Sequence, residues 1–263
     1  MKYFFDHINE ILDRVAVAAH TAYFSDYDGT LVPIVKNPDL AQLSPETKNL
    51  LIHLAEIPSI SVGIVSGRGL SDIQMHVGIS HIFYVGSHGL EIAMPDGTMK
   101  PTPLDLNMTR ALEEIRKKIT FIQKAHDGIL IEDKGACLAV HYRNVNPLSA
   151  PAIGEAVRII EAEHVPHVIL KSGKKVWEFV PNLNVTKGTA IEEIYKTLPN
   201  QALWVYAGDD RTDEDAFEVV RRLRGITIHV GPSNHSLAEY FINEAVDINN
   251  VLKIFSKESI YGR

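Results

Sequence analysis

Apolar segments of strand length recur along the N-terminal part of the chain, and each one ends at a cluster of polar residues. An amphipathic pattern over residues 5–18 predicts an opening helix. The largely apolar runs at residues 21–25, 60–65 and 82–85 predict buried strands. Ser44, which precedes a proline, predicts the N-cap of a further helix. Strands that alternate with helices indicate βαβ units and therefore a parallel sheet.

The pattern changes in the middle of the chain, where two helical patterns are each followed by two short strand patterns. The helices are expected at residues 104–125 and 151–164, and the strands at 128–132, 136–142, 168–171 and 175–180. This αββαββ order predicts a separate α+β unit with an antiparallel sheet. From Lys187 the alternation of helix and strand resumes, with apolar strands at residues 203–207 and 226–230.

Together these two patterns predict an α/β fold with an insertion. We expect a doubly wound, Rossmann-like parallel sheet formed by residues 1–104 and 182–263, interrupted by an α+β domain of residues 105–181. The length of 263 residues suits a core domain that carries a smaller inserted one.

The composition excludes several classes of protein. Hydrophobic residues make up 45% of the chain and charged residues 22%, which is typical of a soluble globular protein. The net charge is −7, and the short basic run at residues 221–224 falls at a predicted helix end, where cations complement the helix dipole. We therefore expect no nucleic-acid partner. The longest apolar runs are far shorter than a membrane span, so we expect no membrane partner either.

The expected location is the cytoplasm. Cys137 is the single cysteine, which excludes an internal disulfide and fits a reducing compartment. Asp6, Glu10 and Asp13 interrupt the apolar region that a secretory signal peptide would need. We expect the chain to act there as a monomer on a small molecule.

Polar side chains collect where the predicted parallel strands end, and ligands bind beyond this edge in open α/β sheets. In chain order these residues are Asp26 with Asp28, Ser66, His88, and Asp209 with Asp210, and Lys187 near a helix start points toward the same edge. Because the carboxyl ends of parallel strands meet at one edge, we expect these side chains to form a single site.

The paired carboxylates of Asp26 and Asp28 favour metal-assisted nucleophilic chemistry. Two positions apart in extended backbone, both side chains point to one side and repel each other unless a cation intervenes. This arrangement suits a nucleophile beside a general acid or base, with a hard divalent cation held by oxygen ligands. Gly29 permits the sharp exit that such a strand end needs. The same pattern also fits an ordinary turn after a strand.

The other clusters favour the catalytic interpretation. Asp209, Asp210 and Asp213 place three carboxylates after a buried strand, which costs repulsion unless a metal or basic groups offset it. Ser66 offers a hydroxyl group to a phosphate oxygen. Lys187 offers a positive charge, and a helix start adds the support of the helix dipole.

Four segments resemble the haloacid dehalogenase (HAD) superfamily of phosphotransferases. They are residues 26–30 (DYDGT), residues 66–68 (SGR), Lys187, and residues 208–213 (GDDRTD). The resemblance implies that Asp26 attacks phosphorus to form a phosphoaspartate, and that Asp28 protonates the leaving alcohol and then activates water. It also implies that Ser66 and Lys187 hold the phosphoryl oxygens.

The same resemblance implies a Mg²⁺ cofactor. Asp26, the carbonyl of Asp28 and Asp209 would bind the ion, and Asp210 and Asp213 would support or complete its coordination shell. Phosphoryl transfer needs in-line positioning and neutralisation of the phosphoryl oxygens, which a cation and Lys187 would supply.

Further segments resemble the trehalose-6-phosphate phosphatases of this superfamily. They are residues 65–68, 86–91, 141–143, 173–178 and 208–217. The resemblance implies that the inserted domain is a cap that binds sugar hydroxyls through Glu132, Lys134, Arg143, Lys174 and Glu178. It places Arg68 and His88 at the core side of the sugar pocket. Taken singly, charged residues on hairpins are usually solvated.

The chain departs from this family at two positions. Ser25 stands where the family more often has an apolar residue, and Ser87 replaces an Asn that many members carry. Neither change removes a catalytic group, but Ser87 bears on the contacts at the sugar side.

The activity that the resemblance implies is hydrolysis of trehalose 6-phosphate to trehalose and phosphate. A related phosphatase for sucrose, glucosylglycerol or mannosylglycerate phosphate remains an alternative, because the core motifs do not separate these substrates. A phosphomutase would use the same nucleophile but needs a bisphosphate cycle. The alternative that is not an enzyme is a catalytically silent regulator that binds a sugar phosphate, since a fold alone does not prove activity.

Overall fold

The computed structural model describes residues 1–35, 40–173 and 175–261, and the chain falls into two compact units. The first unit combines residues 1–101 with 185–263, and the second comprises residues 102–184. The inserted domain predicted at residues 105–181 lies inside the second unit and is three residues short of it at each end.

The first unit is built on a nine-stranded sheet that is parallel except at one edge. Across the sheet the strands are β1 (Lys2–Tyr3), β13 (Tyr240–Ile242), β12 (Ile226–Val230), β11 (Leu203–Gly208), β2 (Thr21–Asp26), β3 (Ile60–Val65), β4 (Phe83–Gly86), β5 (Glu91–Ala93) and β6 (Met99–Pro101). Neighbours from β1 to β4 run parallel, and β5 and β6 add antiparallel strands. This topology confirms the predicted α/β fold class.

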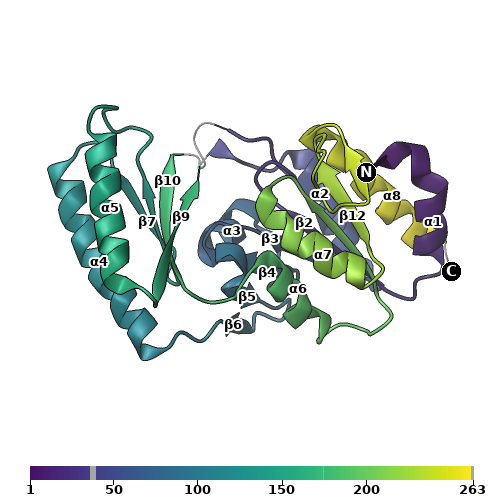
Figure 1. The fold of residues 1–263 in the computed structure, drawn as a ribbon. Coiled ribbons are helices and arrows are strands. Elements are labelled where there is room, and N and C mark those ends of the chain that lie inside the picture. The colour runs from purple at the N-terminus through teal and green to yellow at the C-terminus, as the bar shows by residue number, and fades with distance from the viewer. Residues whose placement is uncertain (36–39, 174, 262–263) are drawn as a thin grey trace. The chain divides into compact units, whose positions relative to one another are not determined.

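Helices cover both faces of this sheet (Figure 1). One face packs against α1 (Ile8–Ala16), α2 (Pro45–Ala55), α3 (Leu70–Val77) and α8 (Ile248–Tyr261), and the other against α6 (Lys187–Tyr195) and α7 (Glu214–Arg222). Strand β2 is buried along its whole length, because Tyr23 enters the first layer and Phe24 the second.

The second unit has its own antiparallel sheet and its own core. Its elements in chain order are α4 (Leu106–Ala125), β7 (Leu130–Asp133), β8 (Leu138–His141), α5 (Ala150–His164), β9 (Val168–Gly173) and β10 (Val176–Pro181). The strand order across the sheet is β7-β8-β10-β9, and the αββαββ prediction is confirmed. Both helices lie against one face of this sheet (Figure 1), where Ile115, Val157 and Phe179 share an apolar layer.

Local structure differs from the predicted elements mainly where elements are short. The pattern over residues 5–18 predicts one helix, whereas a 3-10 turn (Phe4–His7) precedes α1, which ends at Ala16. Strands β5, β6 and β13 have three residues each, too few for hydrophobic periodicity to reveal them. Ser44 is the N-cap of α2 as predicted, and its Oγ accepts the Thr47 N–H at 3.0 Å. Within the described ranges, no helix combines the length and apolar character that crossing a membrane requires.

Candidate active site

The side chains predicted to form the site come from separate segments that meet at the carboxyl edge of the large sheet. Strands β4, β3, β2 and β11 are parallel neighbours, so their carboxyl ends form a continuous edge. β2 ends at Asp26, β3 leads into Ser66, and β11 leads into Asp209. Lys187 is the first residue of α6, which confirms its predicted place at a helix start.

Lys187 lies between two buried carboxylates. Its Nζ donates to Asp26 Oδ1 at 2.6 Å and to Asp213 Oδ1 at 2.7 Å, and all three side chains are at most 7% exposed. Burial alone would lower the pKa of Lys187, but the two carboxylates outweigh it and hold that pKa above its ordinary value. Thr186 caps α6 with its side chain, which fixes the first turn and hence the lysine.

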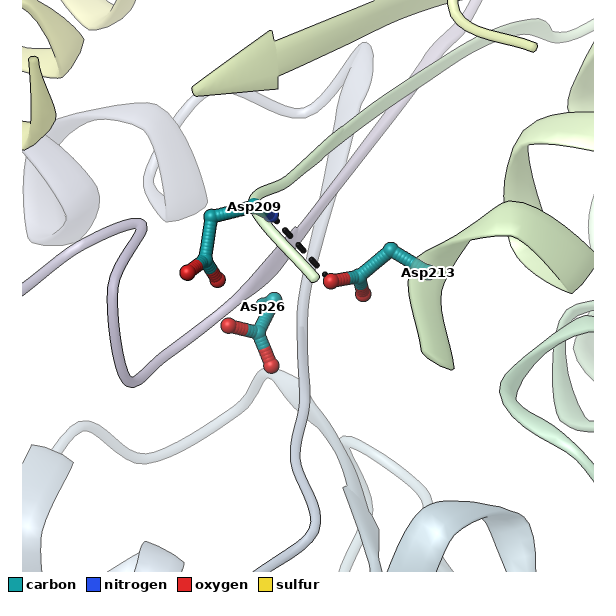
Figure 2. Close-up of side chains that lie close together, drawn as sticks. All are labelled: Asp26, Asp209 and Asp213. Carbon is teal, nitrogen blue, oxygen red and sulfur yellow. Dashed lines mark hydrogen bonds between the residues drawn. The ribbon is translucent and has the colours of Figure 1, made fainter. Parts of the chain in front are cut away.

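Asp213 is fully buried and accepts four hydrogen bonds. Oδ1 accepts from Lys187 Nζ and from the Tyr206 hydroxyl, each at 2.7 Å. Oδ2 accepts the backbone N–H of Asp209 at 3.2 Å, which Figure 2 shows, and that of Asp210 at 3.1 Å. These bonds occupy the lone pairs of both oxygens, so Asp213 suits a supporting role that fixes the loop carrying Asp209.

Asp26, Asp209 and Asp213 form a compact carboxylate cluster (Figure 2), with one oxygen from each lying within 4.8 Å of the others. When all three are ionised, they face the single ammonium of Lys187 and leave two excess negative charges. The pKa of Asp209 is raised to about 6, mainly by burial and next by repulsion from Asp213. Burial also raises the pKa of Asp26 well above its ordinary value, although Lys187 opposes the shift.

The side chains present fit a divalent cation. Its charge would offset the two excess negative charges, and carboxylate oxygens are the ligands that hard cations prefer. Gly29 has a φ of +97°, and a Cβ there would lie 2.1 Å from Asp209 Oδ2, so only glycine lets the two segments approach this closely. Thr30 Oγ1 donates to Asp209 Oδ1 at 3.2 Å and orients that carboxylate.

Asp28 has a different environment from Asp26. Arg68 Nε donates to Asp28 Oδ2 at 2.6 Å, and Arg68 Nη2 donates to Asp28 Oδ1 at 2.8 Å. This is a bidentate pair, which holds a carboxylate in one orientation. The Asp28 side chain is 41% exposed, against 7% for Asp26, and it is not a member of the three-carboxylate cluster found among the described residues.

Asp210 also lies outside that cluster. Its side chain is exposed, and its Oδ1 accepts the Arg211 N–H at 2.6 Å as the N-cap of a short 3-10 turn, Arg211–Asp213. The carboxylate of Asp210 therefore stabilises its own turn, while its backbone N–H donates to Asp213.

Ser66 and His88 come from adjacent loops that are joined by backbone hydrogen bonds. The His88 N–H donates to the Ser66 carbonyl at 3.0 Å, and Ser66 Oγ accepts the Arg68 N–H at 3.1 Å. Ser87 and His88 both have left-handed backbone, with φ of 49° and 57°. The His88 ring lies so close to Gly67 that a Cβ there would be 2.5 Å from His88 Cε1. Strained backbone of this kind is typical of functional sites.

The two departures from the family have local partners. Ser25 Oγ donates to the Asp26 carbonyl at 2.8 Å, and Ser87 Oγ donates to Glu91 Oε2 at 2.9 Å. Both serines therefore brace backbone or side chains beside the site.

One face of the sheet in the second unit carries charged side chains. Glu132 Oε2 lies 2.9 Å from His141 Nε2, and Lys134 Nζ donates to Glu178 Oε1 at 2.7 Å. Glu132 and Glu178 are both paired with Ala139 in the strand register, so they share a face, while Phe179 enters the core. The Lys134 and Glu178 side chains are only 8% and 15% exposed, unlike ordinary charges on a hairpin.

The other two cap residues predicted to bind sugar are placed differently. Arg143 is exposed and follows the end of β8. Lys174 lies outside the described residues.

Two residues in contact with the cluster, Tyr206 and Thr30, are not among the predicted site residues. Thr30 lies within the predicted DYDGT segment, but no role follows from its position there. Tyr206 carries a hydroxyl group in an otherwise apolar strand end, and a buried tyrosine hydroxyl usually needs a partner. The sequence therefore indicates that the Tyr206 hydroxyl group has a hydrogen-bond partner. It does not identify that partner, which depends on the tertiary structure.

Comparison with known proteins identifies the family of the chain. The family model described as trehalose-phosphatase matches residues 24–245. A trehalose 6-phosphate phosphatase of Zea mays is 33% identical, over 93% of this chain and 72% of the relative. A trehalose-phosphate phosphatase of Mycobacterium tuberculosis is 35% identical over 78% of this chain, and the match spans 52% of the relative's length.

Solved structures share the fold. The C-terminal domain of a Candida albicans trehalose-6-phosphate phosphatase superimposes with a TM-score of 0.76 at 22% identity, covering 95% of this chain and 96% of the other. An Aspergillus fumigatus trehalose-6-phosphate phosphatase gives a TM-score of 0.64 at 26% identity, covering 95% of this chain and 97% of the other. With its family match over most of the sequence and its carboxylate cluster at the expected sheet edge, the chain belongs to the trehalose-phosphatase family.

Proposed function

We propose that the chain is a Mg²⁺-dependent phosphatase that converts trehalose 6-phosphate to trehalose and inorganic phosphate, a step of trehalose biosynthesis. The observation that carries this proposal is the buried contact of Lys187 with Asp26, beside the carboxylate of Asp209. The choice of substrate is supported by family membership and by relatives that are named for this substrate and are 33% and 35% identical.

In the proposed first step, Asp26 becomes covalently phosphorylated. A carboxylate oxygen of Asp26 attacks phosphorus, the bond from phosphorus to the sugar oxygen breaks, and Asp28 gives a proton to that oxygen. Lys187, whose Nζ is 2.6 Å from Asp26 Oδ1, offsets negative charge on the phosphoryl oxygens beside the nucleophile. Ser66 offers its hydroxyl group to the same oxygens.

In the proposed second step, Asp26 is regenerated. Asp28, now a carboxylate, takes a proton from a water molecule whose oxygen attacks phosphorus. The bond between phosphorus and Asp26 then breaks, and inorganic phosphate leaves. The partly exposed side chain of Asp28 suits a group that serves first the leaving alcohol and then water.

Asp26 and Asp209 would hold Mg²⁺ with carboxylate oxygens, and Asp28 with its backbone carbonyl. Asp213 and Asp210 would support this set, Asp213 through its bonds to the backbone of residues 209 and 210. When bound, the ion supplies positive charge that offsets the charge of the phosphoryl group during transfer.

We further propose that the polar sheet face of the second unit recognises the sugar. The residues concerned are Glu132, Lys134, Arg143, Lys174 and Glu178, and the proposed contacts from the first unit are Arg68 and His88. A hydroxyl group both donates and accepts, so a mixture of carboxylates and cations suits a polyol. The nearly buried Lys134–Glu178 pair supports this proposal, because it is already oriented by mutual contact.

Phosphate release tests the function directly. The assay compares trehalose 6-phosphate, sucrose 6-phosphate, glucosylglycerol phosphate and glucose 6-phosphate, each with Mg²⁺ and with EDTA. A Mg²⁺-dependent preference for trehalose 6-phosphate is expected. Preference for another sugar phosphate would keep the chemistry and reject the substrate, and no release from any of them would favour a silent binding protein.

The nucleophile is tested by Asp26→Asn. The variant should have no measurable turnover on any substrate, while its circular dichroism spectrum and melting temperature show that it is folded. Retained turnover in a folded variant would reject Asp26 as the nucleophile.

A further inference from the structure

Asp28, the proposed general acid and base, is joined to helix α3 through Arg68. Two nitrogens of Arg68 hold the two Asp28 oxygens, at 2.6 and 2.8 Å. The third nitrogen, Nη1, donates to Asp72 Oδ2 at 3.1 Å and lies 3.3 Å from His76 Nε2. Asp72 and His76 are four positions apart on α3, so they present their side chains on one face of the helix.

The contacts of His76 define its tautomer. A guanidinium group only donates, so His76 Nε2 accepts from Arg68. His76 Nδ1 lies 3.0 Å from the Asp72 carbonyl oxygen and 3.1 Å from Asp72 Oδ1, so Nδ1 carries the proton and donates. His76 therefore joins two Asp72 oxygens to the guanidinium group.

Tyr27 supports the same guanidinium group from its face. The Arg68 Cζ atom lies 5.5 Å from the centre of the Tyr27 ring, and the Tyr27 hydroxyl donates to the Ala41 carbonyl at 2.7 Å. The Arg68 side chain is only 9% exposed, whereas that of Asp28 is 41% exposed. Because the planar guanidinium group is fixed by α3 and by Tyr27, the orientation of the Asp28 carboxylate follows from that of Arg68.

We propose that Asp72 and His76 are positioning residues, which hold Arg68 so that Arg68 orients the Asp28 side chain, which in its protonated form serves the leaving oxygen. This proposal rests on the proposed phosphatase function and deepens it. Neither residue takes part in bond making. Their effect is on how often Asp28 lies in the geometry from which it can transfer a proton, and small displacements of a catalytic group reduce rates strongly.

The test compares substrates whose leaving groups differ in their need for a proton. The alcohol of trehalose 6-phosphate leaves only with a proton from the acid, whereas the nitrophenolate of p-nitrophenyl phosphate leaves without one. The value of kcat/KM reports the steps up to cleavage of the phosphorus–oxygen bond, so it excludes the later use of Asp28 as a base.

Asp72→Ala should lower kcat/KM for trehalose 6-phosphate by about tenfold to a hundredfold, a part of what a general acid contributes. It should lower kcat/KM for p-nitrophenyl phosphate by less than about threefold, since that leaving group does not use the acid. Asp72→Asn keeps an oxygen acceptor for Arg68 and should recover most of the activity. His76→Ala should act in the same direction and more weakly, because its contact with Arg68 is longer. Ser71→Ala, at an exposed position on α3, is the matched control and should change neither value.

A double-variant comparison separates positioning from general damage. Asp28→Asn alone should lower kcat/KM for trehalose 6-phosphate, and adding Asp72→Ala to it should cause little further loss, because the residue that Asp72 positions is already inactive. Melting temperatures of all variants report whether the fold is intact.

Equal losses on both substrates, additive losses in the double variant, or a faster reaction of Asp72→Ala with trehalose 6-phosphate would each overturn the proposal. Failure of the wild-type chain to hydrolyse trehalose 6-phosphate would reject only the proposed substrate. The leaving-group comparison would then use the sugar phosphate of the panel that the chain does hydrolyse.

Discussion

At the scale of single residues, the site concentrates carboxylates around one buried ammonium group. Lys187 contacts Asp26 and Asp213, and these contacts also connect α6 to the end of β2 and to the turn after β11. A buried ion pair adds little stability by itself, but removing one partner leaves uncompensated charge in the interior. Lys187 therefore serves stability as well as the proposed chemistry.

The variant Lys187→Met should lower the free energy of unfolding by about 3 kcal/mol or more at pH 7 in EDTA, because both carboxylates then lose their counter-charge. Urea denaturation measures this change. Lys196→Met is the matched control, since Lys196 is the C-cap residue directly after the same helix and its side chain is 63% exposed. The control variant should lower the free energy of unfolding by less than about 0.5 kcal/mol. Similar losses in the two variants would contradict the role assigned to Lys187.

At the scale of elements, β7, β8 and β10 place charged side chains on one face of their sheet while the other face packs on α4 and α5. The strand period of two makes this separation possible, because successive side chains alternate between the faces. Two of the paired groups, Lys134 and Glu178, are nearly buried, and burying charged groups costs desolvation free energy. We therefore expect this pair to have a binding role rather than a stabilising one.

The sugar role of this face is tested by Glu178→Ala. Turnover of trehalose 6-phosphate should fall about tenfold or more, because a buried cation loses its partner and the sugar loses an acceptor. Hydrolysis of p-nitrophenyl phosphate, which has no sugar, should change far less. Glu155→Ala is the control, because Glu155 lies on α5 and pairs with Arg158 through an exposed side chain. Equal losses on both substrates would contradict a sugar site on this sheet.

The same face should make the stability of the second unit depend on pH. Burial alone would raise the pKa of Glu132, but the bond to His141 and the charge of Lys134 outweigh it, so this pKa lies below its ordinary value of 4.5. A lowered carboxyl pKa contributes stability that is present above 4.5 and is lost as the pH falls through the folded-state pKa.

Urea unfolding between pH 7 and pH 3 checks this dependence. In a Trp204→Phe background, the fluorescence of Trp177 reports the second unit alone, because the chain has two tryptophans. With Glu132→Gln added, the free energy of unfolding should fall less between pH 7 and pH 3. An unchanged pH profile would mean that Glu132 titrates alike in the folded and unfolded chain.

At the scale of the whole molecule, the chain combines a parallel α/β unit that carries the carboxylate cluster with an inserted unit that carries the polar sheet face. The parallel and the antiparallel sheet carry different groups. Strand ends of the parallel sheet gather the groups proposed to react, and strand faces of the antiparallel sheet present the groups proposed to select the substrate. Family relatives extend beyond the matched region, which spans 72% of the Zea mays protein and 52% of the Mycobacterium tuberculosis protein.

Mg²⁺ should stabilise the folded chain as a whole. Binding to the folded state alone adds about 2.7 kcal/mol at a free concentration one hundred times Kd, so the melting temperature should rise with Mg²⁺ and fall back with EDTA. Asp209→Asn should abolish most of this rise. Asp210→Asn should retain most of it, because the Asp210 carboxylate caps its own turn. Equal responses of the two variants would contradict the separate roles assigned to these neighbours.

The sequence by itself determined the fold class and the sheet edge at which the carboxylate cluster lies. Apolar runs that end in polar clusters are local signals, and a parallel topology necessarily brings the ends of such runs to one edge. Asp26, Lys187, Asp209 and Asp213 were therefore predictable, as was the αββαββ order of the insertion. The three-residue strands were not, since they are too short to show a period.

Only the tertiary structure decided which partners these groups contact. Asp213 proved to be saturated by Lys187, Tyr206 and two backbone N–H groups, and Asp28 proved to be held by Arg68. These contacts join residues that are up to 40 positions apart, and they depend on which side chains the packing brings within hydrogen-bond distance. Local pattern carries no information about that choice, because the same carboxylate can serve a metal, a lysine or a backbone turn until its neighbours in space are known.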